Sequence, residues 1–173
     1  PALIAAAVLE HGAEVGIALD GDADRLIAVD HTGRVVDGDH IIAITANDLR
    51  ARGELRDDTV VVTVMTNLGF RLAMRDVGIE VVETAVGDRY VLEQMLQHDV
   101  ALGGEQSGHV IFRDQATTGD GLITAVRFLS LAARRAISVG ELAAAMRRFP
   151  QVLVNVEVAH KERLDEAREV WDA

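Results

Sequence analysis

The sequence predicts an α/β fold in which a mostly parallel, mixed sheet is flanked by helices. Apolar, often β-branched runs alternate with helical patterns of about ten residues, and this alternation indicates βαβ units. The run Val15–Leu19 is apolar throughout, which is typical of a strand buried on both faces. A length of 173 residues is enough for one domain with a real hydrophobic core and further pieces attached.

The elements follow in a regular order because glycines end the helices and acidic or polar residues start them. Gly12, Gly53 and Gly78 each follow an apolar helical pattern, and Ser138–Glu141 has the sequence of a capping box. Pro150 then breaks the last helical pattern of the central region. The expected helices are 1–11, 41–52, 70–77, 90–97, 121–133, 142–148 and 161–171, and the expected strands are 15–19, 26–29, 34–36, 58–66, 79–84, 100–102, 110–112 and 152–158.

An acidic loop, Asp20-Gly21-Asp22-Ala23-Asp24-Arg25, follows the first strand directly. Small residues separate the three aspartates, so the loop can curl until the carboxylates converge. At about 5 Å and an effective dielectric constant of about 20, each pair would repel by roughly 3 kcal/mol. A bound cation removes this repulsion, and ligation by oxygen alone suits Mg²⁺ or Ca²⁺ rather than Zn²⁺ or copper.

Other interpretations of the acidic loop have to be weighed. A solvated acidic turn needs no ion. An EF-hand loop requires glycine at its sixth position and glutamate at its twelfth, where this chain has Arg25 and His31, so that interpretation fails. A phosphatase of the haloacid dehalogenase type would use Asp20 as nucleophile with Asp22 beside it, but it usually has Thr or Val in place of Asp24.

A second acidic group, Asp37-Gly38-Asp39, precedes a helical pattern, and helix capping is its expected role. Asp120 is expected as an acid in the first turn of another helix. In a parallel sheet, ligands meet the loops at the carboxyl ends of the strands. The acidic loop, the loop Val86–Arg89 and the loop after Leu102 are all expected at such an edge.

The loop after Leu102 is rich in glycine and precedes the strand 110–112. Its glycines let the backbone approach a ligand, while Glu105, Ser107 and His109 present polar groups at alternating positions. Glutamate accepts from hydroxyls, serine donates and accepts, and histidine can donate to a phosphate, so the set suits a sugar phosphate. A purely structural hairpin with a hydrogen-bonded His109 is the alternative.

Composition limits the partners of this chain. A formal net charge of −11 and the absence of a basic stripe oppose binding to nucleic acid. The chain has no cysteine, which is compatible with a cytoplasmic enzyme. No apolar run reaches the roughly 18 residues that cross a bilayer, so no membrane partner is expected.

The two loops together resemble the α-D-phosphohexomutase superfamily. Its members carry a D-G-D-[GA]-D-R metal loop and, further along the chain, a G-E-x-S-G-H sugar-recognition loop, which match Asp20–Arg25 and Gly104–His109. Glutamine in the variable place, Gln106, resembles the phosphoglucosamine mutase branch, as do Val86–Tyr90 and Thr118–Gly121. Phosphomannomutase and phosphoglucomutase relatives more often have methionine or leucine at that variable place.

The resemblance implies that this chain is the central part of a four-domain enzyme. By this likeness, residues 1–35 are the end of the second domain with the metal loop, 36–149 the third domain, and 150–173 the linker and the start of the fourth. The superfamily's phosphoserine lies in the first domain, and none of Ser107, Ser130 and Ser138 matches its loop. The chain is therefore expected to be inactive alone.

The resemblance also implies roles for individual residues. Asp20, Asp22 and Asp24 would bind Mg²⁺, and Arg25 would contact the transferred phosphoryl group. Glu105 and Ser107 would hold the hydroxyls of a hexosamine phosphate, with Arg89 and His109 in support. The expected reaction interconverts glucosamine 6-phosphate and glucosamine 1-phosphate through a phosphoserine enzyme and a bisphosphate intermediate. A phosphomannomutase or phosphoglucomutase, and a non-catalytic metal- or sugar-binding module, remain as alternatives, and a homodimer is left open.

Overall fold

The computed structural model describes residues 1–154 and 157 and contains two sheets. A four-stranded sheet has the order β5-β4-β6-β7, with β4 parallel to β5 and β6 and with β7 antiparallel to β6. A smaller sheet, β1-β2-β3, is antiparallel. The expected mixed, mostly parallel sheet is thus confirmed. The strands are β1 (Val15–Leu19), β2 (Leu26–Asp30), β3 (Val35–Val36), β4 (Thr59–Thr63), β5 (Glu80–Thr84), β6 (Leu102–Gly104) and β7 (Val110–Phe112).

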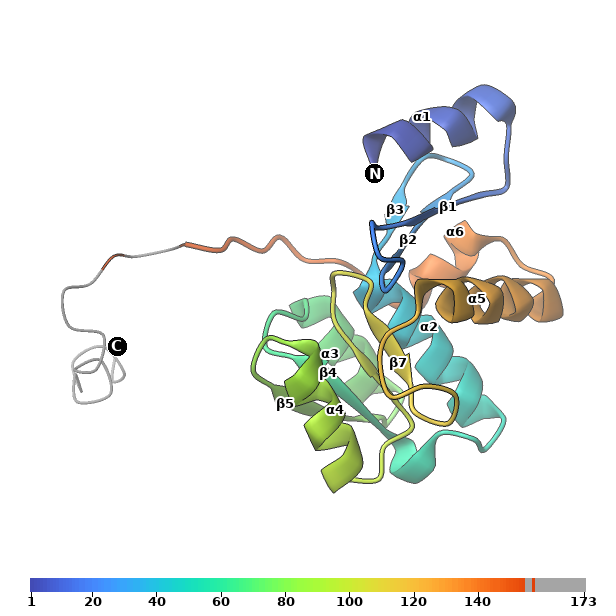
Figure 1. The fold of residues 1–173 in the computed structure, drawn as a ribbon. Helices are drawn as coiled ribbons and strands as arrows, with labels where there is room; N and C mark the ends of the chain where they lie inside the picture. Colours follow the sequence, from blue (N-terminus) through green and yellow to red (C-terminus); the bar gives the residue numbers. More distant parts are fainter. Residues whose placement is uncertain (155–156, 158–173) are drawn as a thin grey trace.

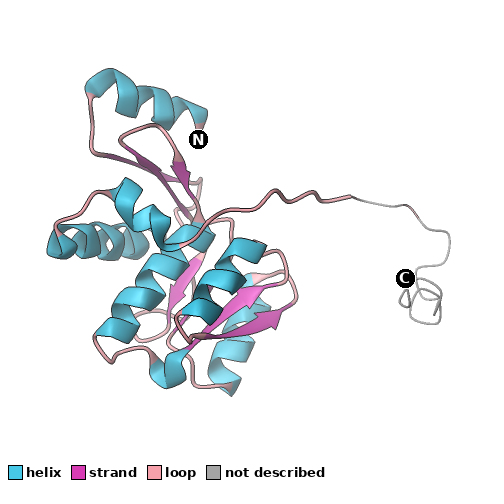
Figure 2. Cartoon of the chain, turned by 180° about the vertical axis from the view of Figure 1, so that it is seen from behind, coloured by secondary structure: helices cyan, strands magenta, loops and turns pink. Residues whose placement is uncertain are grey.

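Helices flank the four-stranded sheet, while α1 lies at the far end of the molecule, next to the antiparallel sheet (Figures 1 and 2). Among the described residues the helices are α1 (Ala2–His11), α2 (Gly38–Ala51), α3 (Leu68–Asp76), α4 (Asp88–Gln97), α5 (Gly121–Arg135) and α6 (Val139–Leu142), with short 3-10 turns η1 (Arg56–Asp58) and η2 (Ala143–Ala145). No helix in this part of the chain is long and apolar enough to cross a membrane.

The core lies on both faces of the four-stranded sheet because successive residues of a strand point to opposite faces. Val60 and Val62 of β4 belong to the larger buried cluster, which includes Phe70 and the inner face of α2. Val61, between them, belongs to a second cluster that includes Met95 of α4. Complete burial of each such side chain contributes about 1.5–3 kcal/mol.

The helix starts are close to expectation. Asp37 is the N-cap of α2, where its side chain accepts a hydrogen bond from His40 N, and Ser138 and Glu141 form the capping box of α6. Asp120 is itself the N-cap of α5 and accepts from Ile123 N, so it stands one step before the first turn in which we expected it.

We expected the acidic loop at the edge of the parallel sheet, but the structure places it elsewhere. It joins β1 to β2 in the antiparallel sheet, whose register pairs Leu19 with Leu26 and closes a hairpin. Backbone contacts bring it to the other sheet: Arg25 forms an isolated bridge with His109, and Leu26 N donates to Gly108 O at 3.0 Å. The Val86–Arg89 loop and the loop after Leu102 do follow parallel strands.

Two strands of the four-stranded sheet differ from the predicted bounds by more than one residue. The strand expected at 58–66 ends at Thr63, because Thr66 N turns back to Thr63 O at 3.0 Å. The strand expected at 100–102 instead spans Leu102–Gly104. A side chain at Gly103 would start only 2.7 Å from Met95 Sδ, so glycine serves here for close packing rather than for a turn.

The end of the described chain also differs from the prediction. The helix expected at 142–148 is replaced by α6, η2 and an extended segment, because contacts with the start of α3 hold residues 147–151 in that form. Residues 152–154 of the strand expected at 152–158 have no regular structure and lead away from the body (Figure 1). Residues 155, 156 and 158, and the helix expected at 161–171, lie outside the described residues.

Candidate metal and sugar-phosphate site

The three aspartates of the acidic loop converge, as we expected. One carboxylate oxygen from each of Asp20, Asp22 and Asp24 lies within 4.8 Å of the others. The turn is shaped by Ala23, which has a positive φ of 61°, and by Arg25 N, which donates to Asp20 Oδ1 at 3.2 Å. The chain therefore closes the loop with its own backbone and leaves the carboxylates on one side.

The charge of this loop fits a hard cation. The guanidinium of Arg25 is the nearby positive group, with its Nε 3.7 Å from oxygens of both Asp20 and Asp24. Desolvation raises the pKa of Asp20, but the backbone N–H and the charge of Arg25 outweigh it and hold that pKa below its usual value. Asp24 Oδ1 is buried and has no hydrogen-bond partner. An unpaired carboxylate oxygen in such a cluster is a natural ligand for Mg²⁺.

His109 connects the sugar-recognition loop to this acidic loop. His109 is only 2% exposed, and its Nε2 accepts a hydrogen bond from the backbone N–H of Gly119 at 2.9 Å. Because Nε2 accepts, Nδ1 carries the proton and donates to Asp24 Oδ2 at 3.0 Å. A side chain at position 119 would collide with the ring. Both ring nitrogens are thus engaged within the protein, and His109 contacts the metal loop rather than the space expected for sugar.

The sugar-recognition loop lines a cavity of about 480 Å³ together with Arg25. Glu105 is half-buried, and its Oε1 accepts the backbone N–H of Gly87 at 3.1 Å, which ties the loop to the Val86–Arg89 loop. Ser107 is exposed at the cavity. The remaining lining residues are Asp37, Thr63, Met65, Val86, Gln106 and Arg148. The structure therefore brings Arg25, Glu105 and Ser107 to one space, as we expected.

Like His109, Arg89 was predicted to support the sugar and does not line this cavity. Its side chain is 81% exposed and its Nε donates to Glu93 Oε1 at 2.8 Å, one turn further along α4. It belongs to the outer surface of that helix.

Two charged lining residues, Asp37 and Arg148, had not been predicted as site residues. Arg148 Nη1 lies 3.5 Å from Asp37 Oδ2, so the capping residue of α2 also orients an arginine at the cavity. Burial raises the pKa of Asp37, but hydrogen bonding to His40 and the charge of Arg148 hold it below its usual value. The local sequence does not indicate a site role for Arg148. It predicts a helix at 142–148, which does not form.

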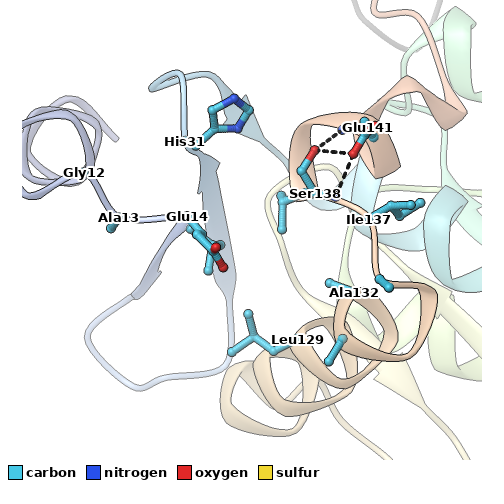
Figure 3. Close-up of a pocket in the computed structure, with 13 residues that line it drawn as sticks. Gly12, Ala13, Glu14, His31, Leu129, Ala132, Ile137, Ser138 and Glu141 are labelled. Carbon is cyan, nitrogen blue, oxygen red and sulfur yellow. Dashed lines mark hydrogen bonds between the residues drawn. The ribbon is translucent and has the colours of Figure 1, made fainter.

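A larger cavity, of about 880 Å³, lies elsewhere and carries no comparable chemistry. It is enclosed by the segment between α1 and β1, by α5 and by the start of α6 (Figure 3). Ser138 and Glu141, two of its polar lining residues, bond to each other in the capping box (Figure 3). The sugar-recognition loop and Arg25, the last residue of the acidic loop, line the smaller cavity.

With this geometry described, comparison with known proteins identifies the family. Residues 37–149 match the family model of phosphoglucomutase/phosphomannomutase, alpha/beta/alpha domain III. The chain belongs to the phosphoglucomutase/phosphomannomutase family.

In curated relatives, more than half of the residues that align with the chain are identical to it. It is 61% identical over 168 residues to the phosphoglucosamine mutase of Frankia casuarinae, covering 97% of this chain and 37% of the relative. It is 57% identical over 171 residues to the phosphoglucosamine mutase of Streptomyces coelicolor, covering 99% of this chain and 38% of the relative. The chain thus spans well under half the length of these relatives.

Solved structures of phosphohexomutases share the fold. A phosphoglucomutase/phosphomannomutase family protein from Burkholderia thailandensis superposes with a TM-score of 0.72 at 28% identity, covering 86% of this chain and 31% of that one. An N-acetylphosphoglucosamine mutase from Aspergillus fumigatus, in complex with GlcNAc-6P and magnesium, gives a TM-score of 0.67 at 22% identity, over 84% of this chain and 35% of that one.

Proposed function

We propose that the chain is the central part of a phosphoglucosamine mutase, which interconverts glucosamine 6-phosphate and glucosamine 1-phosphate. The contact between the metal loop and the sugar-recognition loop, in which Asp24 Oδ2 meets His109 Nδ1 at 3.0 Å, carries this proposal. It links the loop with the converging carboxylates to the loop that lines the sugar cavity. The 61% identity to a phosphoglucosamine mutase supports this choice of substrate.

Asp20, Asp22 and Asp24 would hold Mg²⁺, since their oxygens converge and Asp24 Oδ1 accepts no hydrogen bond. The bound ion supplies positive charge that stabilises the phosphoryl group during transfer. Arg25 lines the sugar cavity and also contacts the acidic loop, so its guanidinium can hold phosphoryl oxygens next to the metal site. His109 keeps Asp24 oriented through its Nδ1 proton.

Glu105 and Ser107 would bind the hydroxyls of the sugar from the cavity wall. Glu105 is already oriented by Gly87 N, which leaves its second carboxylate oxygen for a sugar hydroxyl. Because hydroxyls recur around a hexose ring, the same pair can hold the sugar in both of its orientations, as a phosphoryl exchange between O6 and O1 requires. The surface position of Arg89 removes it from this set.

The phosphoserine that exchanges the phosphoryl group would come from another part of the enzyme. It gives its phosphoryl group to glucosamine 6-phosphate, the resulting bisphosphate reorients, and the 6-phosphoryl returns to serine. We therefore expect the purified 173-residue chain to show no turnover of either glucosamine phosphate. A cytoplasmic location and a homodimer are part of this proposal, and cell fractionation and analytical ultracentrifugation test them.

The decisive experiment compares the full-length enzyme on glucosamine, mannose and glucose phosphates. We expect kcat/KM to favour glucosamine 6-phosphate by about tenfold or more, and a preference for either other sugar would contradict the proposal. Ser107→Ala should raise KM in that assay. Arg89→Ala, at the exposed start of α4, is the control, and it should leave both kinetic constants near those of the unsubstituted enzyme.

A further inference from the structure

The first turn of α2 packs directly under the sugar-recognition loop. Gly38 N donates to Gln106 O at 3.1 Å, and a side chain at position 38 would overlap the carbonyl oxygen of Glu105. The loop therefore rests on the helix without any intervening side chain. Whatever fixes this turn also fixes the loop.

Asp39 lies in this turn and is 0% exposed. Its Oδ2 accepts two hydrogen bonds, from Gln106 Nε2 at 3.2 Å and from Asn67 N at 2.8 Å. Its Oδ1 is buried without a partner. Asp37 already caps the helix, so capping does not explain a second carboxylate here. Burial of such a group is costly, which points to a role for the two bonds it accepts.

The two donors belong to two different segments that border the sugar cavity. Gln106 is part of the sugar-recognition loop, which forms one wall. Asn67 anchors the other wall: its side chain accepts from Phe149 N at 2.9 Å and donates to Phe149 O at 2.8 Å. Met65 and Arg148, which line the cavity, are the near neighbours of these two anchor residues in the chain.

A further bond closes this second wall. Gln151 Nε2 donates to Met65 O at 2.9 Å, and Asn67 Nδ2 reaches Gln151 Oε1 at 3.3 Å. Gly69 leaves no room for a side chain against Arg147 O. The segment 147–151 is thus held across the start of α3.

We propose that Asp39 is a positioning residue that sets the width of the sugar cavity by tying Gln106 on one wall to Asn67 on the other. This role rests on the proposed function, because it assumes that the cavity binds the sugar. Asp39 itself does not touch the substrate. It holds the loop that carries Glu105 and Ser107 at a fixed separation from Arg148.

The test uses the full-length enzyme with the substitutions Asp39→Ala and Asp39→Asn. Alanine removes both accepted bonds, so KM for the hexose phosphate should rise about tenfold while kcat changes much less. Asparagine keeps one oxygen for both donors, so its KM should stay within about threefold of the unsubstituted enzyme. Gln106→Leu removes one bond from a half-buried residue and should raise KM several-fold.

Asp48→Ala provides the matched control. Asp48 is also a buried carboxylate of α2, 4% exposed, but it does not line the sugar cavity. Asp48→Ala should lower stability without changing KM. Unchanged KM values for Asp39→Ala and Gln106→Leu would overturn the proposal. If Asp39→Ala does not fold, Gln106→Leu decides alone.

Hydrogen exchange gives a readout that does not depend on activity. Asp39→Ala should speed amide exchange in both 103–109 and 147–151, whereas Asp48→Ala should not. Normal protection of both segments in Asp39→Ala would also contradict the proposal. Failure of the proposed function would show differently, as an unsubstituted enzyme that does not turn over glucosamine phosphates.

Discussion

At the scale of single residues, the site depends on buried polar groups whose partners are far apart in sequence. Asp39 accepts from Asn67 and Gln106, and His109 joins Gly119 to Asp24. Each of these groups must keep its hydrogen-bond partners, because a buried donor or acceptor without a partner costs about 1–3 kcal/mol. The same constraint gives two predictions that test single side chains.

The pKa of Asp39 should make stability depend on pH. Burial, together with the charge of Asp37, raises this pKa to about 6 from 3.8, against the hydrogen bond from Asn67 N. A raised folded-state pKa contributes stability that is complete below pH 3.8 and is lost as pH rises through about 6. The loss amounts to about 3 kcal/mol.

Asp39→Asn has no such titration, so its unfolding free energy relative to the unsubstituted protein should increase by about 2–2.5 kcal/mol between pH 4 and pH 8. Urea unfolding at a series of pH values measures this difference. A difference that stays flat with pH would show that Asp39 does not titrate in this range.

His109→Ala should weaken Mg²⁺ binding by about 10- to 100-fold, because Asp24 loses the hydrogen bond that orients it. Calorimetric titration with Mg²⁺ measures the affinity. Ser107→Ala, on the same loop, is the control and should bind Mg²⁺ normally. Unchanged affinity in His109→Ala would mean that Asp24 holds its position without the histidine.

At the scale of elements, α2 organises the molecule from both of its ends. Its first turn carries the sugar-recognition loop, and its last turns are joined to α5 through Asp48, which accepts from Arg134 at 2.6 Å, from Arg135 at 3.1 Å and from Arg52 at 3.1 Å.

Asp48→Ala should lower the free energy of unfolding by about 1–3 kcal/mol, because a buried carboxylate with three charged donors is lost while the arginines can turn to solvent. Chemical denaturation measures the change. Arg34→Ala is a surface control, since this arginine is well exposed and pairs with Asp30. A loss no larger than that of the control would contradict the role of Asp48.

At the scale of the whole molecule, the excess of negative charge makes stability depend on bound cations. The net charge of −11 includes three converging carboxylates with one arginine beside them. A divalent cation that binds only the folded state raises its stability by mass action. Mg²⁺ should therefore raise Tm, and Asp22→Asn should abolish most of the increase. Thermal scans at constant ionic strength measure this effect, and an equal rise in both proteins would indicate general screening instead.

The sequence predicts both loops because each is a contiguous motif whose residue types state its chemistry. Asp20, Asp22 and Asp24 need only a short turn to converge, and Glu105 and Ser107 need only one strand end. The contacts that join the loops could not be predicted from the sequence, because no local pattern indicates that His109 faces Asp24 or that Asp39 faces Gln106. The prediction of a helix at 142–148 was wrong because this segment also depends on long-range contacts. The hydrogen bonds between Phe149 and Asn67 override helical propensity there.

The backbone bridge between Arg25 and His109, with Leu26 N bonded to Gly108 O, joins the two sheets through main-chain atoms alone. Most side-chain substitutions leave these main-chain atoms in place, so they do not separate the β1-β2 hairpin from the sugar-recognition loop. Proline is one exception, because it has no amide hydrogen. Any side chain at Gly108 is another, because its Cβ would lie only 2.1 Å from the backbone oxygen of Leu26. Changes in chain length are better accommodated at the turn 31–33, on the opposite side of the small sheet, where added residues leave this join undisturbed.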